Sequence, residues 1–205
     1  MTDFNRGGAG CPGFLPEIEV KILTIQRKKI VFLGDSITWG FPWGPSESWV
    51  NRLEQVLDAE LINKGMNGNT TGDMLRRFDR AVLNCQPTHV VISGGINDVF
   101  CGESFDRITW NIREMAATAQ ANGIKVILGT PTAVDDPFWE VLLIRIREWM
   151  ADYARANNIA LIPFHQAFYD QDGGVKTELL LLDGGHPDKE GYRQMFEQID
   201  LSIFD

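Results

Sequence analysis

The stretch IVFLGDSITWG, residues 30–40, carries the strongest structural signal in this chain. Its first four residues are apolar and strand-forming, and they lead directly into a Gly-Asp-Ser tripeptide that ends at Ser36. A second informative stretch, LLLLDGGHPDKEGY at residues 179–192, places Asp183 three positions before His186. A serine after a strand and a distant Asp/His pair supply the three side chains that nucleophilic catalysis by serine requires.

Short apolar runs recur along the rest of the chain, at intervals that leave room for a helix between them. Each run is nearly continuous in apolar character, as expected of strands buried on both faces of a parallel sheet. The five predicted strands are 30–33, 60–63, 89–93, 125–129 and 159–163.

The segments between these runs have apolar residues at helical spacing. Thr70 and Asp73 are spaced as an N-terminal capping box, and Asn122-Gly123 is typical of a helix C-terminus. The predicted buried faces are Trp49, Leu53, Val56 and Leu57; Met74, Phe78, Ala81 and Val82; Phe105, Ile108, Ile112, Met115 and Ala119; Leu142, Ile146, Trp149 and Tyr153; and Tyr192, Met195, Phe196 and Ile199. Alternating strands and helices of this length predict a doubly wound, three-layer α/β/α fold.

A length of 205 residues without an internal repeat or linker predicts a single domain. Residues 1–17 are rich in Gly and Pro and are expected to form an irregular arm, and residues 18–205 the domain. In open parallel sheets, sites form at the carboxyl ends of the strands. Segments dense in Gly, Asn, Asp, Ser and Thr follow three of the predicted strands, at 34–40, 65–71 and 94–98.

The composition argues against several kinds of partner and location. A formal net charge of −9 and a pI near 4.8 disfavour a nucleic-acid partner, which requires a basic face. No run approaches the roughly 20 apolar residues of a membrane span. The N-terminus lacks the pattern of a secretory signal, and Cys11, Cys85 and Cys101 lack a metal-binding spacing. We therefore expect free thiols and a cytoplasmic location.

Ser36 is the candidate nucleophile because it follows the first predicted strand directly. A serine hydroxyl is a weak nucleophile at neutral pH and needs an adjacent base. The surrounding residues do not form the Gly-x-Ser-x-Gly elbow of the α/β-hydrolases. A serine after a turn also commonly caps a helix, so its position by itself leaves both interpretations open.

His186 is the candidate base, since the patterns around His89 and His165 favour structural roles. Asp183 can hold one imidazole tautomer and stabilise the cation that forms when Ser36 loses its proton. A proline follows the histidine and favours the start of the last helix there. A polar turn that caps this helix is the alternative interpretation of the same residues.

An oxyanion hole needs hydrogen-bond donors aimed at the oxygen on which negative charge develops. The backbone N–H of Ser36 is one candidate, and that of Gly68 is a second, because glycine lets the backbone approach a substrate closely. The side-chain amide of Asn97 is the third. Each is an ordinary turn residue by itself, but all three follow predicted strands of one sheet.

Together these residues resemble the SGNH, or GDSL-like, hydrolase superfamily, whose sequence blocks contribute Ser, Gly, Asn and His in that order. The matching residues, in block order, are Gly34-Asp35-Ser36, Gly68, Gly95-Ile96-Asn97-Asp98 and Asp183-Gly-Gly-His186. The matches span residues 30–192, and residues 1–29 lie outside them. Ile37 stands where the GDSL name has leucine, a difference that concerns packing only.

The resemblance implies a five-stranded, flavodoxin-like parallel sheet and an acyl-enzyme mechanism without a metal or cofactor. It implies Ser36 as nucleophile, His186 as base and acid, and Asp183 as the orienting carboxylate. The oxyanion hole would then consist of Ser36, Gly68 and Asn97. The implied reaction is hydrolysis of carboxylic esters of small molecules, lipids or sugars, with esterase, thioesterase and carbohydrate deacetylase as its variants. We expect a monomer or a small homo-oligomer that binds a small-molecule ester.

Four aromatic residues are candidates for substrate contact: Trp39, Trp43, Phe138 and Trp139. The first two follow the candidate nucleophile, and the others follow the fourth predicted strand. They could line an acyl pocket or stack on a sugar ring. Ordinary packing of loops onto the domain is the alternative.

Other chemistries would use neighbouring residues. Cys101 could act as a papain-like nucleophile, although no strand-to-helix turn presents it. A non-catalytic flavodoxin-like binding module would need a phosphate loop after the first strand, which residues 35–40 match poorly. A metallophosphoesterase would take its ligands from Asp35, Asn97, Asp183 and His186.

Overall fold

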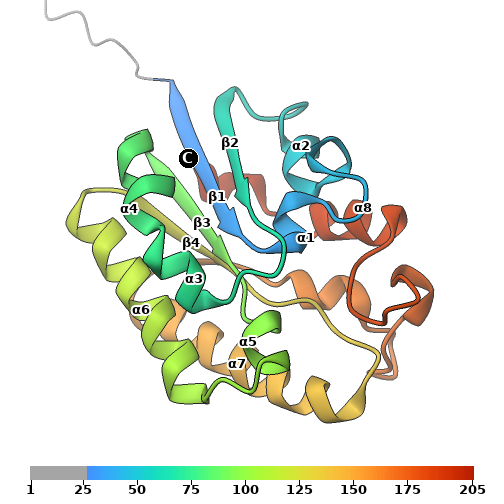
Figure 1. Ribbon diagram of the computed structural model, residues 1–205. Helices are drawn as coiled ribbons and strands as arrows, with labels where there is room; N and C mark the ends of the chain where they lie inside the picture. Colours follow the sequence, from blue (N-terminus) through green and yellow to red (C-terminus); the bar gives the residue numbers. More distant parts are fainter. Residues whose placement is uncertain (1–26) are drawn as a thin grey trace, which may run out of the picture.

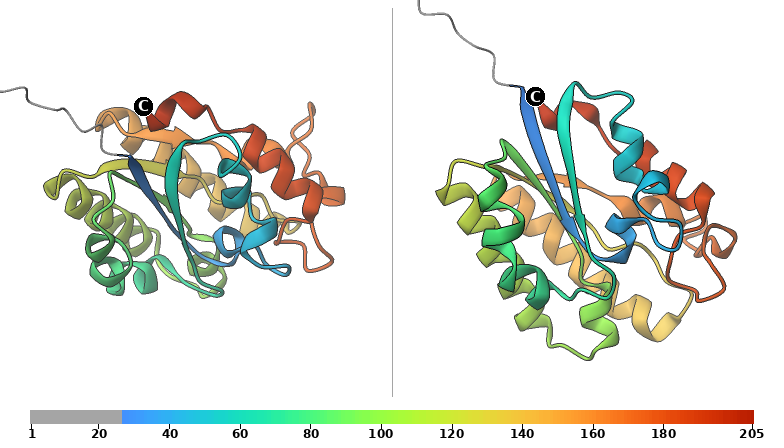
Figure 2. Two further views of the ribbon diagram at one scale, coloured as in Figure 1. Left: turned by 90° about the horizontal axis from the view of Figure 1, so that it is seen from above. Right: turned by 45° about the horizontal axis from the view of Figure 1, so that its top comes forward.

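Residues 27–205 are described by a computed structural model, in which a parallel sheet is covered by helices on both faces (Figures 1 and 2). The sheet has five strands in the order β2-β1-β3-β4-β5. The strands are β1 (Lys28–Gly34), β2 (Ala59–Gly65), β3 (His89–Ser93), β4 (Lys125–Gly129) and β5 (Ala160–Ile162). The predicted three-layer α/β/α fold and its five-stranded parallel sheet are therefore confirmed.

The helices divide between the two faces of the sheet. Helices α3, α4, α6 and α7 cover one face, and α2 and α8 pack together on the other (Figure 2). The α-helices are α1 (Ser36–Trp39), α2 (Trp49–Leu53), α3 (Thr71–Arg76), α4 (Phe78–Ala81), α5 (Ile96–Phe100), α6 (Phe105–Ala121), α7 (Pro137–Ala156) and α8 (Lys189–Glu197). Short 3-10 helices are η1 (Pro45–Glu47), η2 (Leu83–Cys85), η3 (Phe164–Phe168), η4 (Thr177–Leu179) and η5 (Leu201–Phe204).

The apolar run of β1 lies at the centre of the core. Residues 30–33 have no exposed surface, because helices cover the strand on both sides. The ring of Phe32 meets Trp49 edge to face at a centroid distance of 5.4 Å, and Trp49 in turn lies 4.7 Å from Phe164. Each such buried side chain contributes about 1.5–3 kcal/mol to folding. These contacts fix β1 against α2 and the segment that begins with η3.

The helix ends show which local predictions were correct. Thr70 and Asp73 form the predicted capping box at the start of α3. Helix α6 ends at Ala121, and Gly123 follows with a φ of 72°. These short-range signals were sufficient because each involves hydrogen bonds within one turn of the chain.

Two predicted buried faces were partly wrong, and one segment predicted as a single helix is divided in two, although all four residues of its predicted face are buried. Helix α2 ends at Leu53, so Val56 lies beyond it and is half exposed. The segment predicted as one helix around residues 74–82 breaks at Arg77, where φ is −104° and ψ is 7°. In α7, Leu142 is 40% exposed, and the buried stripe instead consists of Leu143, Ile146, Met150 and Ala154. Apolar residues fill more than one side of α7, so spacing did not show which side faces the sheet.

The predicted arm at residues 1–17 lies outside the described residues. Between residues 27 and 205, no helix is long and apolar enough to cross a membrane.

Candidate active site

The candidate nucleophile lies where β1 meets α1, at the carboxyl edge of the sheet (Figure 1). Asp35 caps α1 by accepting a hydrogen bond from the backbone N–H of Ile37 at 2.9 Å. The helix packs so closely on the strand ends that a Cβ on Gly34 would lie 2.0 Å from Thr38 Oγ1. The Gly-Asp-Ser turn thus holds Ser36 at the first position of a helix, with 6% of its surface exposed.

The structure brings Ser36, His186 and Asp183 together in one hydrogen-bonded series. Ser36 Oγ lies 2.8 Å from His186 Nε2, although the two residues are 150 positions apart in the chain. His186 Nδ1 lies 2.7 Å from Asp183 Oδ2. If Nδ1 carries the proton and donates to the carboxylate, Nε2 is free to accept from the serine hydroxyl. This is the geometry that general-base activation of a serine requires.

Asp183 is held by the turn that it begins. Its Oδ1 accepts hydrogen bonds from the backbone N–H groups of Gly185 and His186, both at 3.0 Å. Partial burial alone would raise the pKa of Asp183. The two backbone hydrogen bonds and the imidazole outweigh burial, so the pKa lies below its usual value. The carboxylate is therefore ionised at neutral pH, as an orienting group must be.

The imidazole of His186 is also fixed from the side of α1. The ring of Phe41 lies 4.5 Å from it, centroid to centroid, at an interplanar angle of 43°. The backbone oxygen of Phe41 accepts a hydrogen bond from Tyr192 Oη at 2.9 Å. Tyr192 belongs to α8 and has no exposed surface, so the last helix and the loop after α1 jointly position the ring.

The predicted oxyanion donors lie on neighbouring segments. Gly68 is exposed, has a φ of 75°, and has open space where a side chain would point. Asn97, at the start of α5, donates from Nδ2 to the backbone oxygen of Asn69 at 2.9 Å. This bond uses one of the two amide protons of Asn97 and leaves the other available. The structure thus joins the predicted donor segments after β2 and β3.

A buried carboxylate to which the sequence analysis assigned no role anchors the same region. Asp98 has no exposed surface and accepts from the backbone N–H and the hydroxyl of Thr71, at 2.8 and 2.5 Å. Asn111 of α6 donates to the Thr71 hydroxyl at 2.9 Å. Burial raises the pKa of Asp98. These bonds tie the start of α3 to α5, on which Asn97 lies.

Asp35 gives a testable pH dependence of stability. Burial raises its pKa to about 6, although the hydrogen bond from Ile37 acts in the opposite direction. The folded state therefore binds a proton more tightly than the unfolded state, whose pKa is near 3.8. The contribution of Asp35 to stability is complete below about pH 4 and is lost as the pH rises through 6.

We expect Asp35→Asn to remove this loss, because asparagine keeps the acceptor for Ile37 and does not titrate. Between pH 4 and 7, the free energy of unfolding of the wild type should fall by about 1–3 kcal/mol more than that of the variant. Urea denaturation at both pH values measures the difference. Parallel pH dependence in the two proteins would show that Asp35 does not titrate in this range.

The predicted substrate-binding residues lie on two sides of the site. Trp139 lines a cavity of about 340 Å³, and Asp183 and Gly184 line the same cavity. Together with Phe138 it lines a second, more apolar cavity of about 290 Å³ between α5, α6 and α7. Phe138 itself is 67% exposed. Of this pair, only Trp139 contacts the cavity beside the Asp/His turn.

Trp39 and Trp43 lie on the side of α1 and α8. The backbone of Trp39 packs against Gly65, where a Cβ would lie 2.2 Å from its nitrogen. Trp43 packs edge to face with Tyr192 at 6.3 Å and carries the ammonium group of Lys189 5.5 Å above its ring. These contacts place both residues near Phe41, whose ring packs against His186. The spacing of the two tryptophans in the sequence does not show these packing contacts.

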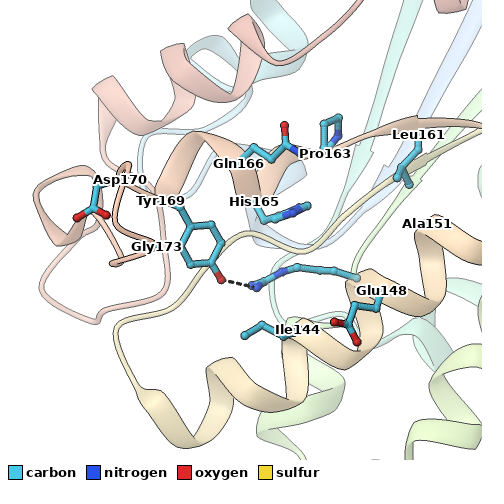
Figure 3. Close-up of a pocket in the computed structure, with 11 residues that line it drawn as sticks. Ile144, Glu148, Ala151, Leu161, Pro163, His165, Gln166, Tyr169, Asp170 and Gly173 are labelled. Carbon is cyan, nitrogen blue, oxygen red and sulfur yellow. Dashed lines mark hydrogen bonds between the residues drawn. The ribbon is translucent and has the colours of Figure 1, made fainter.

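Another cavity is separate from the Ser-His-Asp series. It measures about 630 Å³ and lies between α7, β5 and the segment that begins with η3 (Figure 3). Arg147, one of the residues that line it, donates to the hydroxyl of Tyr169 at 2.8 Å and forms an ion pair with Glu140. His165 also lines it, with its Nδ1 2.8 Å from Thr130 Oγ1.

The alternative chemistries considered from the sequence would need a cysteine nucleophile or a metal site. Cys101 is exposed and follows α5. Within residues 27–205, no group of three or more His, Cys, Asp or Glu side chains is placed to hold a metal ion. Both carboxylate oxygens of Asp183 are occupied by hydrogen bonds from its own turn, which favours an orienting role for this residue.

Comparisons with known proteins identify the family of this chain. The sequence matches the model of the GDSL-like lipase/acylhydrolase family over residues 32–194. The chain is 26% identical to the esterase TesA of Pseudomonas aeruginosa over 185 residues, which covers 87% of this chain and 90% of that protein. It is 26% identical to an arylesterase of Vibrio mimicus over 175 residues, which covers 80% of this chain and 82% of that protein.

A solved structure supports the same relationship. A protein from Desulfitobacterium hafniense, described as lipolytic and of the G-D-S-L family, has a TM-score of 0.77 and 32% sequence identity. The match covers 84% of this chain and 97% of that one. The family match includes the candidate nucleophile and the Asp/His turn. The chain belongs to the GDSL-like lipase/acylhydrolase family and is a carboxylic ester hydrolase.

Proposed function

We propose that this protein is a serine esterase that hydrolyses short acyl or acetyl esters through an acyl-enzyme intermediate. The observation that carries the proposal is the series of two hydrogen bonds from Ser36 through His186 to Asp183, at 2.8 and 2.7 Å. The family membership supports the same class of reaction.

In the first half of the reaction, His186 Nε2 takes the proton of Ser36 while Oγ attacks the ester carbonyl carbon. The resulting imidazolium is stabilised by the carboxylate of Asp183, which remains ionised. Collapse of the tetrahedral intermediate breaks the bond to the alcohol, and the imidazolium donates its proton to the leaving oxygen. In the second half, water attacks the acyl-enzyme with the same base, and the acid is released.

The oxyanion of each tetrahedral intermediate needs donors that are in place before it forms. We assign this role to the backbone N–H groups of Ser36 and Gly68 and to the free amide proton of Asn97. The open space beside Gly68 leaves its backbone accessible to a substrate. The hydrogen bond from Asn97 to Asn69 holds the side-chain amide in one orientation.

The cavity beside the Asp/His turn supports a small, neutral substrate. Its lining combines the aromatic rings of Phe100 and Trp139 with the carboxylates of Asp135 and Asp136. Carboxylates accept hydrogen bonds from hydroxyl groups and repel anions, and aromatic rings stack on apolar faces of sugars and acyl groups. Trp139 lies between this cavity and the apolar cavity of about 290 Å³. We therefore expect short acyl chains to be preferred.

Labelling with a fluorophosphonate, followed by turnover assays, tests the proposal. We expect covalent labelling of Ser36, identified by peptide mass spectrometry, and no change of activity with a chelator. Among p-nitrophenyl esters from acetyl to decanoyl, kcat/KM should be highest at the short end, and acetylated sugars should also be deacetylated. Absence of labelling and of ester turnover would refute the serine mechanism, whereas a decanoyl optimum would refute only the assignment of the acyl pocket.

A further inference from the structure

Arg77 connects the ends of two strands to the segment that carries Gly68. Its Nη2 donates to the backbone oxygens of Gly34, at the end of β1, and Lys64, near the end of β2, both at 2.9 Å. Its Nε donates to Asn69 Oδ1 at 2.7 Å. The planar guanidinium suits such a role, because its donors diverge at fixed angles.

The segment held in this way, residues 66–70, is here termed the oxyanion loop. The backbone N–H of Met66 donates to the same Gly34 oxygen at 3.1 Å, and the N–H of Asn69 closes a turn onto Met66 O at 3.2 Å. Gly68 has a φ of 75° and no atoms around its Cβ position. Because no side chain packs there, order at Gly68 must come from its neighbours.

Asn69 connects Arg77 to Asn97, the predicted oxyanion donor, through two hydrogen bonds. It is 9% exposed, and its two oxygens face different partners. The side-chain oxygen accepts from Arg77, and the backbone oxygen accepts from Asn97 Nδ2 at 2.9 Å. Arg77, Asn69 and Asn97 therefore form a continuous series of hydrogen bonds from the strand ends to the amide assigned to the oxyanion hole.

We propose that Arg77 is a positioning residue for the oxyanion hole, acting through Asn69 on the side chain of Asn97 and on the backbone of Gly68. The inference rests on the serine esterase function proposed above, because it concerns the transition state of that reaction. Arg77 contacts Asn69 and the strand ends rather than the substrate. It restricts the donors to the orientation in which they meet the developing negative charge, so its effect is largest in the transition state.

The break between α3 and α4 agrees with this role. The break occurs at Arg77 itself, which ends one helix and begins the next. Its neighbours Arg76 and Arg80 are exposed, and Arg76 forms an ion pair with Asp73. Arg77 alone of the three directs its guanidinium toward the strand ends. Its three acceptors are neutral oxygens, so its positive charge remains close to the loop at which the oxyanion forms.

The test compares Arg77→Met and Arg77→Lys with Arg76→Met as a matched control. Active sites are first titrated with a fluorophosphonate, so that kcat is expressed per reactive Ser36 and any unfolded protein is excluded. We expect Arg77→Met to lower kcat for p-nitrophenyl acetate by about 10- to 100-fold, below the loss caused by removing a donor itself. KM should change less than about twofold, since ground-state binding does not use the oxyanion donors fully.

A boronic acid inhibitor gives a readout that a purely structural role would not change. It forms a tetrahedral adduct with the serine, so its Ki should rise in proportion to the loss of kcat. Arg77→Lys should recover only part of the loss, because one ammonium group cannot hold both strand carbonyls and Asn69. Arg76→Met should retain the wild-type kcat and Ki.

A double-mutant cycle with Asn69→Ala tests the route of the effect. If Arg77 acts through Asn69, the losses in kcat should be far from multiplicative, because each substitution breaks the same series. A wild-type kcat per titrated site in Arg77→Met and Arg77→Lys, with only a lowered melting temperature, would overturn the proposal. Multiplicative losses in the cycle would overturn the route through Asn69. Failure of the wild type to be labelled would refute the esterase function instead.

Discussion

Ser36→Ala should lower kcat for a short acyl ester by about 10³-fold or more, as loss of a nucleophile does in other serine hydrolases. The hydroxyl is the group that His186 Nε2 contacts at 2.8 Å, and alanine removes it without changing the backbone at the start of α1. The remaining rate would come from the oxyanion donors and substrate binding alone. Initial rates with p-nitrophenyl acetate, and loss of fluorophosphonate labelling, measure the effect.

Ser48→Ala is the matched control for this substitution. Ser48 has no exposed surface, and its hydroxyl caps α2 and donates to the backbone oxygen of Thr38 at 2.8 Å. Its loss should cost about 1 kcal/mol of stability and leave kcat per labelled site unchanged. Near-full activity of Ser36→Ala would remove the basis of the assigned mechanism.

His186→Ala should cause a loss of similar size, because no other base lies within hydrogen-bond distance of the serine hydroxyl among the described residues. Asp183→Asn should cost much less, with a loss about 10- to 100-fold smaller. Asparagine keeps an oxygen for the backbone N–H groups of Gly185 and His186, so the turn is retained. What it loses is the charge that stabilises the imidazolium and the oxygen that accepts from His186 Nδ1, because the amide NH2 takes that position. Rates across a pH series measure both effects.

His165→Ala provides the control for removal of an imidazole. Burial lowers the pKa of His165 to about 4, and its ring bonds Thr130 in the cavity away from the serine. We expect unchanged kcat and some loss of stability. Equal losses of activity from Asp183→Asn and His186→Ala would show that the carboxylate does more than orient and stabilise the imidazole.

The strands could be predicted from sequence because a strand buried on both faces is apolar at nearly every position. A run such as residues 30–33 is apolar throughout, whichever neighbours the strand acquires. Helix caps were predictable for the same reason, since Thr70 and Asp73 interact within one turn. Membership of the family could be inferred because its blocks are short, ordered and located at strand ends.

Helix faces and breaks were less accessible to sequence reasoning. Leu142 and Leu143 are equally apolar, and only the packing of α7 on the sheet exposes one and buries the other. Nothing in the local pattern around Arg77 predicts a break, and the acceptors that its guanidinium reaches lie at the ends of β1 and β2, in other parts of the chain.

The sequence by itself determined the type of sheet, the strand ends and the side chains available for chemistry there. Only the tertiary structure decided that Ser36 and His186, 150 positions apart, lie 2.8 Å from each other, and that Arg77 holds the oxyanion loop. The physical reason is that a strand buried on both faces is apolar throughout, and a helix cap involves residues within one turn, so the sequence displays both directly. A hydrogen bond between distant segments depends on the path of the whole chain, which sets both the distance and the angle.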